Sequence, residues 1–457
     1  MNTLVTITAI GILAMLSEIL NFRKALFPLV LVGLMAALGF AIMDWNTGIR
    51  YFNDMMFFDN YAIAFSSVMI STVLIWFVLS KDYICNSSHQ TDFTSLIIFS
   101  LAGGIVMAGF SDLTMLFLGL EILSIAMYIM AAANKSELRS NEAGFKYFML
   151  GAFATGFLLF GIAFIYGATG SFNLAEIGGY ASSNKSNLPL IFNAGVLLIM
   201  VGLTFKIAAA PFHFWAPDVY EGAPSPVTAY MSTVVKTAAF AAFLRLFTVC
   251  FSGMEDWWAP ALAICSAISM VAGNILAVYQ KSIKRMLAYS SIAHAGYMLM
   301  AVVAMNDISA SSLLMYTAAY SFGSMGVFAL VLTMTRSQNE TIASLKGFSS
   351  VNKIPAVLIS IILLSLAGIP PVSGFFAKYY VFTASLNAGY TWLVLVAVLS
   401  SLIGIYYYFR VIISLFQPAD KDSLQMDVLP VHHLVLWISL ILTVGLGFAP
   451  GIIVDLL

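Results

Sequence analysis

Four ionisable side chains lie inside long apolar stretches of the sequence, namely Glu121, Lys206, Lys236 and Lys378. An ionisable group inside a bilayer costs at least ~2.5 kcal/mol on insertion scales, so such groups persist where they face a partner or a hydrated cavity. Burial disfavours the charged form of a lysine, and a nearby carboxylate favours it. A buried lysine whose carboxylate partner approaches and retreats can therefore bind and release a proton. Glu121 is the partner that we expect for Lys206.

A purely structural role is the alternative to proton transfer for each of these four residues. Glu121 could serve only as a hydrogen-bonding group between helices. Lys206 lies near the end of its apolar run, and a lysine in that position can extend its ammonium towards water. Lys236 lies in the middle of its run, and Lys378 follows Pro370-Pro371. These placements favour proton transfer over a purely structural role.

Two further residues, His294 and Lys146, are weaker candidates for proton transfer. His294 lies in RMLAYSSIAHAGYMLM, and histidine titrates near neutral pH, which suits a proton relay. A hydrogen-bonded structural histidine is the alternative. Lys146 is a second possible relay, but it lies near a loop and could also extend towards water. Arg245 keeps its charge at all ordinary pH values, so it is a poor proton relay, and we expect it in an ion pair or at an interface.

The composition is that of a membrane protein. Hydrophobic residues make up 61% of the 457 residues and charged residues only 9%, against about 25% in soluble domains. The net charge of −1 argues against nucleic-acid binding. The three cysteines and five histidines form no metal-ligand spacing, and no nucleotide-binding motif occurs. We therefore expect neither a metal nor a cofactor on this chain.

Apolar runs long enough for membrane helices predict an all-α polytopic protein with about fourteen spans. The first run lacks the basic start and the cleavage site of a signal peptide, so it is interpreted as a span. The predicted spans are 3–20, 26–43, 61–80, 93–110, 113–133, 143–167, 188–210, 226–251, 258–279, 286–304, 309–334, 354–385, 390–416 and 432–453.

The loop charges predict an orientation. Odd-numbered loops carry most loop lysines and arginines, Lys421 among them, whereas even-numbered loops carry only Arg50 and Lys185. By the positive-inside rule the odd loops face the cytoplasm, so both termini lie on the outer side of the membrane.

Two spans combine a lysine with nearby prolines. Lys206 precedes Pro211 and Pro217, and Pro370-Pro371 precede Lys378. These are the seventh and twelfth spans, and paired broken helices at such a spacing are typical of inverted repeats in transporters. Proline kinks without function are the alternative. We predict one membrane domain over 1–457, divided into 1–92, a first repeat 93–251, a second repeat 258–416 and a last span 432–453.

Four segments carry a resemblance to a known family. They are KYFMLGAFATGFLLFGIAFIYGATGS from Lys146, FKIAAAPFHFWAPDVYEGAPSPVTAYMSTVVK from Phe205, KRMLAYSSIAHAGY and GIPPVSGFFAKYYVF. Together they resemble the antiporter-like membrane subunits of proton-pumping NADH:quinone oxidoreductase, respiratory complex I. The first segment favours the subunit N family over M and L. A subunit L relative would also continue into a long lateral helix, which we do not expect here.

The resemblance implies a fold of two inverted five-helix repeats, spans 4–8 and 9–13, each with a proline-broken helix. It also implies that Glu121, Lys206, Lys236 and Lys378 line a hydrated proton-transfer axis. Lys146 and His294 match possible relay positions on that axis.

The resemblance further implies where the rest of the machinery lies. NADH, FMN, iron–sulfur clusters and quinone would be bound by other subunits, with no redox centre on this chain. Expected partners are antiporter-like subunit M, small subunits of the K, J and A types, and lipids, in the inner membrane. The chain would then be part of a proton-translocating oxidoreductase.

The mechanism that we expect is electrostatic. Quinone reduction elsewhere in the complex separates Glu121 from Lys206, and Lys206 releases its proton towards Lys236 and Lys378. An Mrp-type cation/proton antiporter subunit and a passive structural subunit of the membrane arm are the alternatives. A polytopic enzyme with its own active site is disfavoured, because no catalytic constellation appears.

Overall fold

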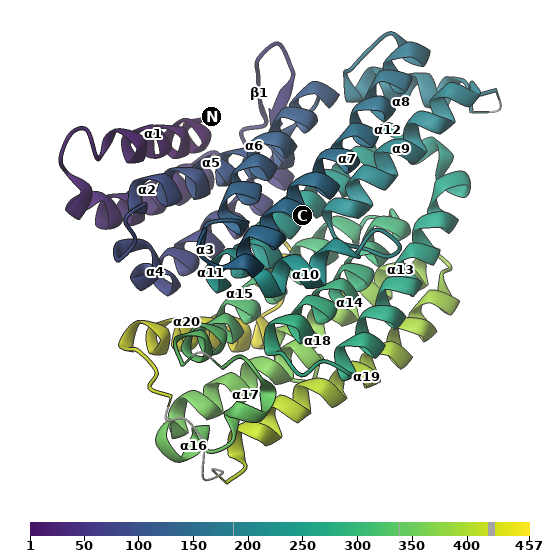
Figure 1. Cartoon of the computed structure of the whole chain (residues 1–457). Helices are drawn as coiled ribbons and strands as arrows, with labels where there is room; N and C mark the ends of the chain where they lie inside the picture. The colour runs from purple at the N-terminus through teal and green to yellow at the C-terminus, as the bar shows by residue number, and fades with distance from the viewer. Residues whose placement is uncertain (186, 338, 419–425) are drawn as a thin grey trace. The chain divides into compact units, whose positions relative to one another are not determined.

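The computed structural model describes residues 1–457 except 186, 338 and 419–425, so Lys421 lies outside the described residues. Helices dominate the described chain (Figure 1). A short antiparallel hairpin, β1 (Ile49–Tyr51) and β2 (Met56–Phe58), pairs Arg50 with Phe57 and was not expected from the sequence. The chain is an all-α polytopic membrane protein with this one small addition.

The helices begin and end as follows: α1 (Asn2–Leu16), α2 (Arg23–Met43), α3 (Asn60–Leu79), α4 (Lys81–Cys85), α5 (Gln90–Gly109), α6 (Leu113–Ala131), α7 (Leu138–Thr169), α8 (Leu174–Ser183), α9 (Leu190–Lys206), α10 (Trp215–Gly222), α11 (Ser225–Tyr230), the π-helical η1 (Met231–Val235), α12 (Lys236–Cys250), the 3-10 helix η2 (Ser252–Met254), α13 (Glu255–Val278), α14 (Ile283–Ala304), α15 (Ser309–Arg336), the 3-10 helix η3 (Ile342–Leu345), α16 (Phe348–Val351), α17 (Lys353–Ala367), α18 (Ser373–Asn387), α19 (Thr391–Phe416), α20 (Pro430–Phe448) and α21 (Gly451–Val454).

Among the described residues, 11 helices are long and apolar enough to cross a membrane. Three shorter apolar helices, α1, α9 and α17, lie in predicted spans as well. Helices form along these runs because the hydrocarbon offers the backbone no hydrogen-bond partner, and a helix satisfies its own amides and carbonyls. Each predicted run overlaps a helix, while the number of crossings, about fourteen, stays a prediction.

The first proline-interrupted span ends earlier than predicted. Helix α9 ends at Lys206 rather than at 210, because Ala208 takes a positive φ of 57° and Pro211 follows. Proline has no N–H to continue a helical ladder. The chain resumes helical structure in α10 at Trp215. The break therefore follows Lys206 directly.

The second interrupted span is two helices rather than one. Helix α17 ends at Ala367, Gly368 adopts a left-handed φ of 86°, and α18 begins at Ser373 after the cis Pro370-Pro371 bond. The amide of Gly374 donates to Ser365 Oγ at 3.0 Å, which links the two halves. The long run 354–385 thus contains a helix break with an open carbonyl end.

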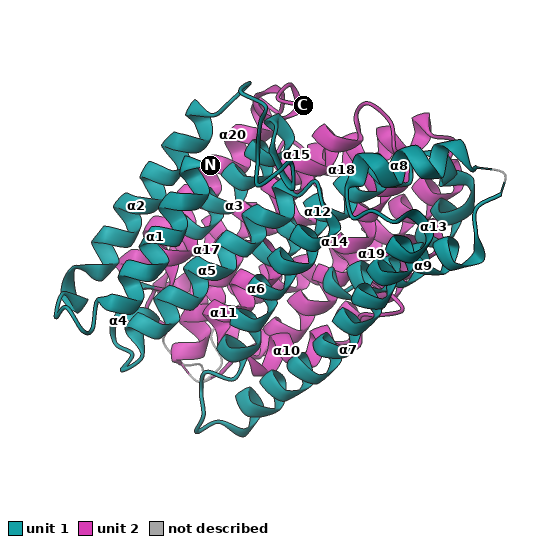
Figure 2. Cartoon of the chain, turned by 90° about the horizontal axis from the view of Figure 1, so that it is seen from above, with its two compact units in different colours: residues 1–74, 81–208, 234–262 teal, residues 75–80, 209–233, 263–457 magenta. Residues whose placement is uncertain are grey.

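The described chain divides into two compact units (Figure 2). Unit 1 comprises 1–74, 81–208 and 234–262, and unit 2 comprises 75–80, 209–233 and 263–457. In unit 1, α7 packs on α9 and α5 on α6 at close range. A Cβ added at Gly161 would lie 2.8 Å from the carbonyl oxygen of Gly195. Small residues permit such approach between membrane helices. The predicted division into one domain with two repeats stays a prediction.

Candidate functional site

Lys206 lies at the end of α9, inside unit 1. Its side chain is buried, with 4% relative exposure, and Nζ donates to Ser124 Oγ of α6 at 2.7 Å. Ser124 Oγ in turn donates to the carbonyl of Leu120. The ammonium does not extend to the surface of the chain, as the alternative interpretation required. Its direct contact is a serine hydroxyl.

Glu121 lies one turn before Ser124 on α6, in the same unit. Its Oε1 is buried and accepts no hydrogen bond from any described residue. The carboxylate acts electrostatically on both Lys206 and Tyr128. The structure therefore brings Glu121 and Lys206 within electrostatic reach, with Ser124, not the carboxylate, in contact with Nζ.

Aromatic rings form the walls around the Lys206 ammonium. Nζ lies 5.9 Å from the ring centroid of Tyr128 and 5.6 Å from that of Tyr147, within cation–π range. The two rings meet edge to face at 4.8 Å. A cavity with about 230 Å³ of empty space, its open side included, lies beside Lys206 and Tyr128. These walls can hold a cation and admit water next to it.

Lys236 begins α12, directly after the π-helical turn η1. Its side chain is buried, with 2% exposure, and it belongs to unit 1. Single π-helical turns inside α-helices are frequent at functional sites, because the extra residue re-aims the side chains that follow. The π turn therefore sets the direction of Lys236.

Lys146 is the most exposed of the candidate lysines. Its Nζ contacts Glu142 Oε1 at 2.7 Å, one turn earlier on α7, and its side chain is 37% exposed. Arg245, which the sequence predicted in an ion pair, donates to Asp59 Oδ1 in unit 1. Both cations thus have carboxylate partners, Glu142 on the same helix as Lys146 and Asp59 directly before α3.

Lys378 belongs to unit 2 and caps the second helix break. Its Nζ donates at 2.8 Å to the carbonyl of Ala367, the last residue of α17, and lies 5.1 Å from the ring centroid of Tyr297. Gly368 lets the side chain pass, because a Cβ there would lie 2.9 Å from Nζ. A cation at an open carbonyl end is favourable, since the helix C-terminus carries partial negative charge.

We predict that Lys378→Met lowers the thermal stability of the assembled protein. The change leaves the buried Ala367 carbonyl without its donor, which typically costs about 1–3 kcal/mol. The measurement is the melting temperature of the purified complex in detergent. Lys281→Met, at an exposed position of unit 2, is the control and should leave it unchanged. Equal melting temperatures for both variants would show that the carbonyl finds another donor.

His294 lies in unit 2 among phenols. Its Nδ1 lies 2.8 Å from Tyr316 Oη and its Nε2 3.1 Å from Tyr408 Oη. Tyr408 Oη also hydrogen-bonds the Ser290 hydroxyl. Close by, Asn274 joins the hydroxyls of Tyr297 and Tyr407, each at 3.1 Å. His294 is thus hydrogen-bonded, as the structural interpretation expected, and its partners can themselves transfer protons.

Sequence reasoning missed several of these partners. Ser124 has a signal in hindsight, because it follows Glu121 by three residues and so shares its helix face. Tyr316 and Tyr408 have none, since they come from helices far from His294 in sequence. Within the described ranges, no group of three or more His, Cys, Asp or Glu residues could hold a metal ion.

The fold and the buried charges define a class. A family model described as "NADH:quinone oxidoreductase/Mrp antiporter, TM" matches residues 111–404. The structure also superposes on a chain of the Mrp complex from Dietzia with a TM-score of 0.85 at 19% identity, covering 99% of this chain and 94% of that one. The class is that of antiporter-like polytopic membrane proteins.

Two relatives narrow the class to a family. NADH-quinone oxidoreductase subunit N of Cytophaga hutchinsonii is 41% identical over 100% of this chain and 99% of its own. A chain of respiratory complex I from Thermus thermophilus is 30% identical with a TM-score of 0.84, covering 99% of this chain and 98% of that one. The chain belongs to the NADH-quinone oxidoreductase subunit N family, and it is a multi-pass inner-membrane protein.

Proposed function

We propose that this chain is a proton-translocating membrane-arm subunit of an NADH:quinone oxidoreductase, and that its buried lysines and Glu121 carry the protons. The proposal depends on one observation. The buried Lys206 ammonium donates a hydrogen bond to Ser124 and lies within electrostatic reach of Glu121. A buried cation of this kind is costly inside a membrane, and such residues typically mark ion or proton pathways. Family membership supplies the oxidoreductase context.

The proposal includes a membrane topology. About fourteen crossings, with both termini on the outer side, agree with the loop charges and with a helix in every predicted run. Two inverted five-helix repeats, each with one broken helix, are supported by the interruptions after Lys206 and before Lys378. NADH, FMN, iron–sulfur clusters and quinone belong on other subunits. Subunit M and small K, J and A subunits are the proposed neighbours.

The proton-release step begins at the Glu121–Lys206 pair. When the neighbouring subunits draw Glu121 away, the Lys206 ammonium keeps only a neutral acceptor, Ser124 Oγ, and two ring faces. In a low dielectric the loss of a counter-charge is large, because Coulomb energies scale inversely with the dielectric constant. Nζ then gives its proton to water in the adjoining cavity and stays neutral until Glu121 returns.

The onward route leads to Lys236 and then Lys378, with His294 and Lys146 as relays. The charged form of Lys378 is stabilised by a hydrogen bond, because the Ala367 carbonyl accepts from Nζ. Protonation of Lys378 strengthens this contact, and deprotonation weakens it, so the helix break responds to the passing proton. Water reloads the pathway from the cytoplasmic side.

The experiment that tests this function is Glu121→Gln in the native host. We expect assembly to persist and NADH-driven proton pumping in membrane vesicles to fall about ten-fold or more, because the amide cannot attract the ammonium as a carboxylate does. Glu137→Gln, at the exposed start of α7, is the matched control and should pump normally. Wild-type pumping in Glu121→Gln would contradict the proposed pair and favour a passive structural subunit.

The Mrp likeness supports a second candidate, a cation/proton antiporter subunit. The two functions differ in what drives transport. Sodium-dependent proton exchange by the chain in vesicles without NADH would favour the antiporter. Proton pumping that requires NADH and quinone would favour the oxidoreductase.

A further inference from the structure

A continuous series of hydrogen bonds passes through His294 in unit 2. Ser290 Oγ bonds Tyr408 Oη, which lies 3.1 Å from His294 Nε2, and Nδ1 of the same ring lies 2.8 Å from Tyr316 Oη. The four residues come from α14, α19 and α15. All four side chains are buried. The series is therefore shielded from bulk water along its length.

Every link in this series can point either way. A neutral imidazole has one donor nitrogen and one acceptor nitrogen, and each hydroxyl both donates and accepts. In one arrangement Ser290 donates to Tyr408, Tyr408 donates to Nε2, and Nδ1–H donates to Tyr316. In the other arrangement all three bonds are reversed, with Tyr316 donating to Nδ1 and Nε2–H donating to Tyr408. Both arrangements satisfy the same heavy-atom positions.

Passage of one proton converts the first arrangement into the second. A proton enters at Ser290 Oγ, which passes its own proton to Tyr408 Oη, and Tyr408 passes its proton to Nε2. The imidazolium then gives its Nδ1 proton to Tyr316 Oη, which releases its original proton to the next acceptor. One proton enters, one leaves, and no heavy atom changes its bonding. The hydroxyls and the ring then turn back before the next transfer.

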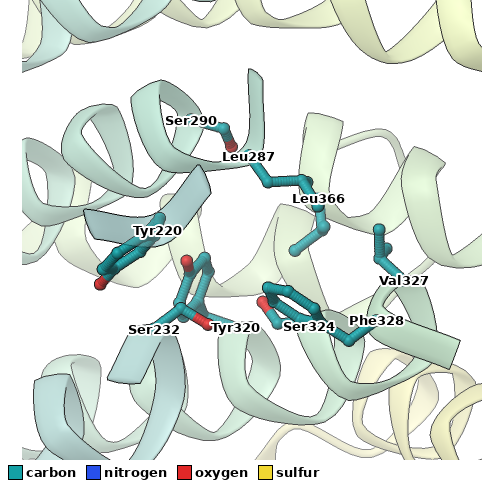
Figure 3. Close-up of a pocket in the computed structure, with 9 residues that line it drawn as sticks. All are labelled: Tyr220, Ser232, Leu287, Ser290, Tyr320, Ser324, Val327, Phe328 and Leu366. Atoms are coloured by element: carbon teal, nitrogen blue, oxygen red, sulfur yellow. The ribbon is translucent and has the colours of Figure 1, made fainter. Parts of the chain in front are cut away.

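The Ser290 end of the series opens on a cavity (Figure 3). The hydroxyl-bearing residues Tyr220, Ser232, Tyr320 and Ser324 line it together with Ser290, and its empty space is about 290 Å³, its open side included. Leu287, Val327, Phe328 and Leu366 complete its lining, so the cavity is mixed, and a water held there can bond to the hydroxyls. In the proposed pathway, such a water supplies the proton that Ser290 accepts.

We propose that Ser290, Tyr408, His294 and Tyr316 form a proton wire that is fed by this cavity, with Tyr408 as the link on which conduction depends. The inference rests on the proposed function and adds to it the tyrosine and serine that make His294 a relay. Tyr408 matters most because its single oxygen contacts both Ser290 and Nε2. The rings of Tyr407 and Tyr408, 4.5 Å apart, hold it in place.

The test is Tyr408→Phe in the whole complex in the native host. The phenylalanine keeps the ring packing and removes only the oxygen. We expect full assembly, NADH-driven proton pumping reduced at least about ten-fold, and a larger solvent deuterium isotope effect on the residual rate, since proton transfer becomes limiting. Tyr406→Phe, on the same helix and 59% exposed, is the control and should match the wild type in all three measurements.

Two results would overturn the wire alone, and a third would overturn the proposed function with it. One is wild-type pumping in Tyr408→Phe while Lys206→Arg, assayed in parallel, has lost it; the proposed function then stands without this relay. The other is reduced pumping with an unchanged isotope effect, which indicates a packing defect. If both Tyr408→Phe and Lys206→Arg pump normally, the proposed function fails as well. Should Tyr408→Phe not assemble, Ser290→Ala replaces it, with the same expected rate and isotope effect.

Discussion

Lys206→Arg is expected to leave the complex assembled and to reduce NADH-driven proton pumping at least ~10-fold. Arginine keeps the positive charge beside Glu121 and can still donate to Ser124, so the electrostatic and hydrogen-bonding roles of residue 206 persist. Its guanidinium does not release a proton at any ordinary pH. The substitution therefore removes only the step in which Nζ becomes neutral. The measurement is proton uptake by inverted vesicles, normalised to the amount of assembled complex.

The companion variants separate charge from proton release. Lys206→Ala removes both, leaving Glu121 without its counter-charge and Ser124 without its donor, so it should pump no better than the arginine variant. Lys185→Arg, at an exposed loop position of the same unit, should pump like the wild type. If Lys206→Arg pumps normally while Lys206→Ala does not, residue 206 supplies a fixed charge, and the proton-release step in our proposal is wrong.

Gly447→Ala is expected to prevent stable assembly. Gly447 lies in α20, and a Cβ at this position would lie 2.3 Å from the carbonyl oxygen of Pro371 and 2.8 Å from Val372 Cα. Both are backbone atoms of the second helix break, so the clash cannot be relieved by a side-chain rotation. Overpacking of this kind typically costs about 1–3 kcal/mol, occasionally more, against a free energy of unfolding of only about 5–15 kcal/mol for a folded protein. The amount of complex in native gels of the membrane fraction measures the effect.

A neighbouring glycine on the same helix provides the control. A Cβ at Gly445 would meet nothing within 4 Å. Alanine also has a higher helix propensity than glycine by about 1 kcal/mol. Gly445→Ala should therefore assemble at least as well as the wild type. Equal assembly of the two variants would show that α20 can move away from the break without loss.

The sequence predicted the interruptions but not their details. Pro211 and Pro370-Pro371 indicated breaks, since proline lacks an amide hydrogen, and both helices do end near these residues. The residues at which the helices end depend on the positive φ angles of Ala208 and Gly368. For Ala208, no local sequence pattern predicts such an angle. The hairpin β1–β2 was likewise missed, because each of its strands has only 3 residues, too few to show an alternating pattern.

The sequence by itself determined that this chain is a helical membrane protein and which ionisable residues are costly to bury, because both follow from local composition and from the absence of water in hydrocarbon. Only the tertiary structure decided their partners. Ser124 contacts Lys206, the Ala367 carbonyl contacts Lys378, and Tyr316 and Tyr408 enclose His294. These contacts depend on how helices that are distant in sequence pack against each other through small residues. Such packing is set by the shape of a whole helix face, and the residue type at a single position does not reveal that shape.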